Sequence, residues 1–323
     1  MQRLRDGRRW SLFDPVDVPN LFEVVGPEFT AAYAAYESSG LAIRDCDIGV
    51  LWNAIVDSQR ETGSPFLLFQ DNINGGCITG FVWLVIEACL ALARAADRSN
   101  ESHLGVIRSS NLCTEIVQFS SPSQPAVCTL ASVSLPTCVD GDGSFNFGRL
   151  QHIVRMVVEN TDRCIDISDY PTTGVAYSAR HTRALGIGVQ GLADVFMLLN
   201  LPFTSIGARE LNISIFETIY YASLDASCRM AEARGPYPAW SGSPASRGFL
   251  QVDMWGVLPS TRHDFVELRA RIARFGLRNS MLTALMPTAS TSKLLGNFES
   301  FEPYTRYRIL CFTHLSLLLP PAR

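Results

Sequence analysis

The chain has 323 residues, 47% of them hydrophobic, and a formal net charge of −4 at neutral pH. This length and apolar content are typical of a globular protein with one large or two ordinary domains. The slight acidic excess leaves no basic stripe for neutralising phosphates, which argues against direct nucleic-acid binding.

The nine cysteines indicate a reducing compartment. Their number is odd, and none of them forms a CxxC pair or a Cys/His cluster with zinc spacing. Residues 1–15 are basic but lack the apolar core and the cleavage site of a secretory signal. We therefore expect a cytoplasmic protein that binds no metal itself.

Helical periodicity runs through residues 15–60, where Phe22, Phe29 and Tyr33 recur at helix-compatible spacing. The apolar run 66–69 that follows has the length and the aromatic content of a buried strand. We expect packing helices, and after them the first strand.

Residues 75–96 form an apolar run long enough to raise the question of a membrane span. Glu87 lies in the middle of this run. A carboxylate there opposes insertion into lipid by about 2.5–3.5 kcal/mol. We expect a buried or misplaced helix instead, and no membrane association.

From residue 109 onward, short apolar runs alternate with helical stretches, which indicates an α/β architecture. Apolar runs occupy 116–119 and 126–135, and helices are expected at about 147–158, 213–234 and 264–275. The turn-rich segment VDGDGSF at 139–145 resembles a calcium loop only in part, because Gln151 stands where a bidentate glutamate is needed. It predicts a surface turn.

Gly186, Gly188 and Gly191 have the spacing of a dinucleotide-binding loop, and a helix is expected to follow them. The dinucleotide fold also needs a following strand that ends in an acidic residue, and the sequence offers no convincing one. The motif therefore favours a nicotinamide or flavin site only weakly.

The segment SSNLCTEIVQF places Asn111, Cys113 and Glu115 at alternating positions. On an extended strand the three side chains point to one face, so that an amide, a thiol and a carboxylate meet. A half-buried strand with satisfied polar residues has the same pattern. The segment alone favours that purely structural interpretation.

The segment MPTASTSKLLGN carries Thr288, Ser290 and Thr291 where an extended run breaks at Pro287 and a helix is expected to begin. Backbone N–H groups and hydroxyls at a helix start can bind an anion. Ordinary N-capping uses the same residue types and is more common.

Six parts of the chain carry a family resemblance: SNLCTEI (110–116), AVCTLAS (126–132), GIGVQGLADVF (186–196), GPY with GSPASRGFLQVDMW (235–255), RNSMLTALMPTAST (278–291) and ESFEPYT (299–305). In their order and spacing they resemble the large catalytic subunit of class I ribonucleotide reductase. The resemblance covers about residues 10–74 and 97–305.

The resemblance implies an α/β fold, specifically an incomplete form of the family's ten-stranded α/β barrel. It divides the chain into a helical part with the first barrel strand (1–74), an apolar insert outside the family pattern (75–96), a catalytic barrel segment (97–305) and a divergent tail (306–323). We expect 110–119 and 280–287 to be neighbouring core strands, with the helix after Gly191 packed outside them.

For function, the resemblance implies an oxidoreductase that reduces ribonucleoside diphosphates to 2′-deoxyribonucleoside diphosphates for DNA synthesis. Cys113 matches the cysteine whose thiyl radical removes the 3′ hydrogen. Asn111 and Glu115 match the residues that hydrogen-bond the ribose hydroxyls and move the 3′-OH proton. Cys128 matches one of two cysteines that reduce the 2′ position and become a disulfide. Thr129 departs from the asparagine that usually follows it.

The resemblance also implies the substrate contacts. Ser110 lies beside Asn111 and Glu115 in the motif that binds the ribose. The diphosphate loop is matched by Thr288, Ala289, Ser290 and Thr291.

The same resemblance implies the partners: a metal-containing small subunit that supplies the radical, thioredoxin or glutaredoxin as reductant, and a homodimer of large subunits. No cofactor is expected on this chain itself. The sites for ATP and dNTP effectors, the second reducing cysteine, the relay tyrosines and the tail cysteines would lie in regions that it lacks. We therefore expect an inactive isolated chain. A reductase-derived, non-catalytic interaction protein and an inactive gene-model fragment are the alternatives.

Overall fold

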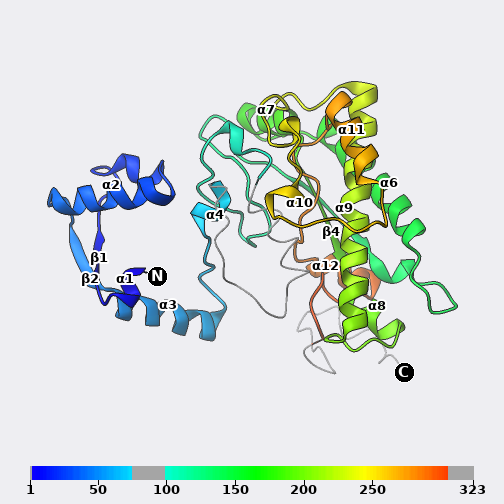
Figure 1. Ribbon diagram of the computed structural model, residues 1–323, viewed down its shortest axis with the longest axis horizontal. Coiled ribbons are helices and arrows are strands. Elements are labelled where there is room, and N and C mark those ends of the chain that lie inside the picture. Colours follow the sequence, from blue (N-terminus) through cyan, green and yellow to red (C-terminus); the bar gives the residue numbers. More distant parts are fainter. Residues whose placement is uncertain (1, 75–98, 305–323) are drawn as a thin grey trace.

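The structure is a computed structural model that describes residues 2–74 and 99–304 (Figure 1). Its α-helices are α1 (Gln2–Arg5), α2 (Gly26–Ser38), α3 (Ile48–Thr62), α4 (Gln70–Asn74), α6 (Phe147–Ile167), α7 (Thr173–Thr182), α8 (Leu192–Leu198), α9 (Ile206–Arg234), α10 (Gln251–Met254), α11 (Phe265–Phe275) and α12 (Ala289–Leu295). Its strands are β1 (Arg9–Leu12), β2 (Arg44–Asp47), β3 (Thr129–Ser134) and β4 (Leu185–Gln190). Short 3-10 helices are η1 (Pro19–Phe22), η2 (Ser102–Leu104), η3 (Leu135–Cys138) and η4 (Ala245–Arg247).

The N-terminal elements α1 to α3 and the antiparallel pair β1–β2 form a small unit at one side of the molecule (Figure 1). Tyr33 on α2 is buried there, and its hydroxyl donates to the carbonyl oxygen of Ser11 on β1 at 2.9 Å. Arg3 makes two hydrogen bonds, of 2.7 and 2.6 Å, to the carboxylate of Glu37. The helices expected within residues 15–60 are thus confirmed as α2 and α3.

The predicted buried strand at 66–69 is wrong. The segment is irregular, and Phe66 and Phe69 are 60% and 62% exposed. A strand needs a hydrogen-bonding neighbour on at least one edge. Within residues 2–74 and 99–304 no segment pairs with this one, so its apolar composition alone does not make it a strand.

The centre of the larger part is β4, whose residues are all buried. On one side β4 pairs in parallel with β3, in the register Thr129↔Leu185 to Ser134↔Gln190. On the other side lies the segment 281–286. There the Leu185 amide donates to the carbonyl of Met281 at 3.0 Å, and the Ala284 amide donates to the carbonyl of Ile187 at 3.2 Å. Both edges of β4 are therefore hydrogen-bonded.

The glycines of β4 serve close packing. A Cβ atom on Gly186 would lie 2.5 Å from the side chain of Leu130, and one on Gly188 would lie 2.6 Å from the sulfur of Met286. Gly191 has φ +79° and is the N-cap of α8. The spacing that resembles a dinucleotide loop thus lies on a buried strand and the turn after it, where side chains fill the space.

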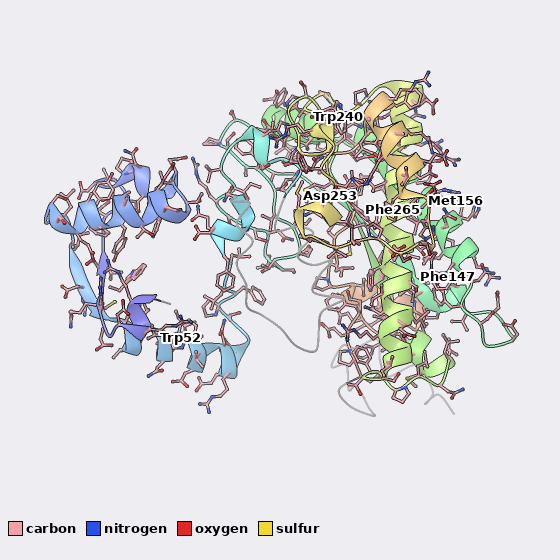
Figure 2. The ribbon with its side chains drawn as sticks, viewed as in Figure 1. Trp52, Phe147, Met156, Trp240, Asp253 and Phe265 are labelled. Carbon is pink, nitrogen blue, oxygen red and sulfur yellow. The ribbon has the colours of Figure 1, made fainter. Side chains whose placement is uncertain are left out.

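Helices cover this strand pair. Helix α6 packs on β3 and on α9, and α9 also packs against α11. Phe265 of α11, labelled in Figure 2, contacts Tyr221 of α9 with ring centroids 5.3 Å apart. Helix α9 begins at Ile206, earlier than the expected start near 213, because the hydroxyl of Ser205 accepts from the Ala208 amide and caps the helix.

The architecture is mixed α/β, but the part of the chain that the structure describes forms no closed barrel. Closure requires every strand to pair on both edges. In the described residues β3 pairs only with β4, and Leu130 on β3 is 44% exposed. The expectation of a ten-stranded barrel is therefore not confirmed by these residues.

The apolar segment 75–96 and the tail 306–323 lie outside the described residues. Among the helices that are described, none is both long and apolar enough to cross a membrane.

The packing of β4 predicts that Gly186→Ala and Gly188→Ala each lower the free energy of unfolding by about 1–3 kcal/mol, because the added methyl group meets tightly packed neighbours. Urea unfolding of the purified chain measures this. Gly141→Ala is the matched control, since a Cβ there meets nothing within 4 Å. Equal stability of all three variants would contradict the packing argument.

Candidate active site

Residues 110–117 form a tight loop, and the predicted strand at 110–119 is wrong. Ser110 and Val117 make an antiparallel bridge, and Thr114 between them has a φ of 67°. Two hydrogen bonds close the loop: the Ile116 amide donates to Asn111 Oδ1 at 3.1 Å, and the Thr114 amide donates to the Asn111 carbonyl at 3.2 Å. The asparagine thus offers the backbone a local alternative to a strand ladder.

The loop brings the three candidate residues together in a different way from the one expected. Asn111 is exposed, but its Oδ1 accepts from the Ile116 amide and closes the loop, and Cys113 is exposed near the tip of the loop. Glu115 is half-buried, and its Oε2 atom is buried without a hydrogen-bond partner among the described residues. A buried carboxylate oxygen without a partner is costly, so this atom is suited to a donor supplied by a ligand.

Cys128 lies just before β3 and packs against the cluster of Ile116, Ala184, Met281 and Ala284. This cluster joins the loop to the segment beside β4, so 110–119 and 280–287 are neighbours as expected, although neither is a regular strand. Burial raises the pKa of the Cys128 thiol far above its usual value, and the charges of Glu101 and Glu115 raise it further. Cys128 is therefore held as a neutral thiol.

The helix expected after Pro287 is confirmed as α12. Thr288 is buried, and its hydroxyl oxygen accepts from the Ser300 amide at 2.9 Å. Ser290 and Thr291 are exposed, and the Thr291 hydroxyl donates to the carbonyl of Thr288 at 2.7 Å. Thr288 thus holds the loop in place, whereas Ser290 and Thr291 lie at its surface.

A carboxylate occupies the first amide of this helix. Ala289 has a φ of 33°, and its N–H donates to Glu299 Oε1 at 2.7 Å. A carboxylate is an anion with the same preference for N–H donors as a phosphate oxygen. The contact shows that this amide donates a hydrogen bond to a negatively charged group.

Sequence reasoning missed Glu101, a fully buried acid beside the candidate site. Glu101 is 0% exposed, and its carboxylate accepts hydrogen bonds from Gln118 Nε2, Ser280 Oγ and the Phe119 amide at 3.1, 2.7 and 3.2 Å. Burial raises the pKa of Glu101 to about 7. Its donors come from segments far apart in the chain, so no local motif marks it.

Similarity to known proteins shows the family of this chain. The family described as "Ribonucleotide reductase, barrel domain" matches residues 1–82 and 87–309. The chain belongs to this family. The match runs into the segment 75–96 from both sides and leaves 83–86 unmatched.

Relatives in the ribonucleotide reductase family come from distant organisms. The chain is 47% identical over 305 residues to the ribonucleoside-diphosphate reductase large chain of Schizosaccharomyces pombe. The matched region is 94% of this chain and 35% of the relative. It is 44% identical to the large subunit of Caenorhabditis elegans and 45% identical to that of Monkeypox virus, of which it covers 36% and 37%. The chain thus spans about a third of the length of these reductases.

The raised pKa of Glu101 predicts a pH-dependent stability. In the folded chain the Glu101 carboxyl keeps its proton up to about pH 7, whereas in the unfolded chain it loses the proton near pH 4.5. The contribution of Glu101 to the free energy of unfolding is therefore complete below pH 4.5 and is lost as the pH rises through 7. Glu101→Gln should therefore be more stable than the wild type above pH 7, by on the order of 3 kcal/mol.

Denaturant unfolding of both proteins at a series of pH values measures this difference. The advantage of the variant should shrink as the pH falls from about 7 to 4.5. Glu302→Gln, at an exposed position, is the control and should show no such window. A difference that stays constant with pH would contradict the assignment.

Proposed function

We propose that the chain is part of a ribonucleoside-diphosphate reductase large subunit, which reduces ribonucleoside diphosphates to 2′-deoxyribonucleoside diphosphates for DNA synthesis. One observation carries the proposal: this chain belongs to the family, and its tight loop 110–117 holds both candidate groups. In that loop Cys113 is exposed, and the Glu115 carboxylate has a buried oxygen without a partner among the described residues. Cys128 packs against the hydrophobic cluster to which Ile116 of the same loop belongs.

The proposed roles follow from these positions. Cys113 carries the thiyl radical that removes the 3′ hydrogen, and the open oxygen of Glu115 accepts the proton of the 3′ hydroxyl. Asn111 and Ser110 shape the loop, since the Ser110 hydroxyl donates to the Ile116 carbonyl at 2.7 Å. Their remaining polar atoms bind the ribose hydroxyls. Cys128, held as a neutral thiol, reduces the 2′ position with a second cysteine from another part of the protein.

The substrate diphosphate, in this proposal, binds at the loop of Thr288, Ala289, Ser290 and Thr291. The Ala289 amide already holds the Glu299 carboxylate, and the exposed Ser290 adds a hydroxyl donor. The Thr291 hydroxyl becomes a further donor when it leaves the Thr288 carbonyl. A diphosphate that displaces Glu299 gains the same amide. Thr288 holds the loop in place through the hydrogen bond that its hydroxyl accepts from the Ser300 amide.

The wider assignment is also proposed. The described α/β part is a segment of the family's ten-stranded barrel, with the division at 1–74, 75–96, 97–305 and 306–323 given above. A metal-containing small subunit supplies the radical, thioredoxin or glutaredoxin supplies electrons, large subunits pair as a homodimer, and the protein is cytoplasmic. The support is family membership and the names of the relatives.

Turnover tests the proposed chemistry. The chain replaces the matching part of the Schizosaccharomyces pombe relative, and this chimera is assayed with a small subunit and a dithiol. Cys113→Ser should abolish turnover, because an alcohol does not provide the accessible sulfur radical. Cys128→Ser should block 2′ reduction while 3′ hydrogen abstraction continues, which release of isotope from 3′-labelled substrate measures.

The control for these variants is Cys164→Ser, since Cys164 is an exposed cysteine near the end of α6. It should keep the turnover of the parent chimera. The isolated 323-residue chain should form no deoxynucleotide. Full activity of the Cys113→Ser chimera would end the assignment of the radical cysteine.

Removal of the Glu299 charge tests the diphosphate loop. In Glu299→Gln the amide oxygen is a weaker acceptor for the Ala289 N–H, so inorganic pyrophosphate should bind about fivefold more tightly. Calorimetric titration of the purified chain measures the affinity. Glu302→Gln changes the net charge equally at an exposed site, and should have a smaller effect. Equal effects of the two variants would indicate only a change in long-range charge.

A further inference from the structure

Glu101 joins two segments that carry the candidate site. The Phe119 amide and the Gln118 side chain that donate to it follow directly after the Cys113 loop. Ser280, the third donor, stands at the start of the segment beside β4 that leads to α12. A buried carboxylate with three donors is a strong junction, because each hydrogen bond is charge-assisted when the acid is ionised.

Gln118 extends this junction to Cys128. Its Nε2 atom donates to Glu101 Oε1 and to the carbonyl of Val127, both at 3.1 Å. Val127 is the residue before Cys128, so the chain of contacts runs from the carboxylate through one amide group to the backbone that presents the thiol. The Cys128 side chain packs against the hydrophobic cluster that includes Met281, the neighbour of Ser280.

We propose that Glu101 is a positioning residue for Cys128, which it holds through Gln118 and Ser280, and that its carboxylate places a negative charge near the thiol. The inference rests on the proposed function only because that function makes the Cys128 thiol a reductant. The contacts of Glu101 do not depend on whether the enzyme turns over.

The electrostatics of the junction agree with the contacts. The charge of Glu101 acts on two titratable groups, Cys128 and Tyr237, and raises the pKa of both. Glu115 raises the pKa of Cys128 from the loop side. The groups that face Glu101 directly, on Gln118, Ser280 and the Phe119 backbone, are neutral donors. Because the pKa of Glu101 is about 7, its influence on the thiol grows as the pH rises through neutrality.

The first measurement uses the wild-type chain. Iodoacetamide alkylates thiolates, and peptide mass spectrometry gives the rate at each cysteine across about pH 6 to 9. The Cys128 rate should rise by clearly less than about tenfold per unit near pH 7, because ionisation of Glu101 opposes thiolate formation. Exposed Cys164 is the internal control for the reactivity of the reagent at each pH. A full tenfold slope at Cys128 would overturn the proposal.

The second measurement compares variants. Glu101→Gln should alkylate at Cys128 at nearly the wild-type rate near about pH 6 and about tenfold faster near about pH 8. Glu302→Gln should change neither cysteine. A ratio that is the same at every pH would overturn the proposal, because it would report looser packing without a role for the charge. If the glutamine variant does not fold, the wild-type slope still decides.

The third variant tests the connection through Gln118. Gln118→Met keeps the carboxylate but removes the hydrogen bonds to Glu101 and Val127, so Cys128 should react faster at every pH while Cys164 is unchanged. An unchanged Cys128 rate would overturn the positioning role. None of these rates depends on turnover, so an inactive chimera would count against the proposed function and leave this test intact.

Discussion

The structure depends on the burial of β4 between two hydrogen-bonded neighbours. All six residues of the strand are buried, and its glycines let β3 and the segment 281–286 approach closely. Each neighbour leads to one part of the candidate site: β3 follows Cys128, and 281–286 runs into the loop at Thr288. The distance between the Cys128 thiol and the loop proposed to bind the diphosphate is thus set by the packing of one apolar strand.

Polar side chains also fix the positions of the segments around β4. Asn297 donates to Ser134 Oγ at 2.7 Å and to Gln190 Oε1 at 3.2 Å, which ties the segment after α12 to the ends of β3 and β4. Near Cys128, Glu101 joins the residues after the Cys113 loop to Ser280, at the start of the segment beside β4. Such buried networks specify one arrangement of the backbone, at a cost in desolvation when they contain a charge. The raised pKa of Glu101 is the sign of that cost.

Much of the helical architecture could be predicted from the sequence, because periodicity acts locally, although the Ser205 cap that begins α9 was missed. The candidate residues were found from short motifs, and these agree with the family match. Their geometry was not predictable, since the Asn111 side chain competes with strand pairing. The exposed segment 66–69 and the buried Glu101 show the same limit: both depend on which distant segments lie beside them.

The closed loop around Cys113 has a consequence for how a substrate would meet the thiol. Hydrogen bonds from the Ile116 and Thr114 amides to Asn111 fasten the loop to itself, and Thr114 is held in the left-handed region. A loop so constrained has little conformational freedom with which to search for a partner. In the proposed reaction, the encounter therefore depends on diffusion of the small molecule to the exposed Cys113 on a constrained loop, and the direction of approach selects the productive collisions.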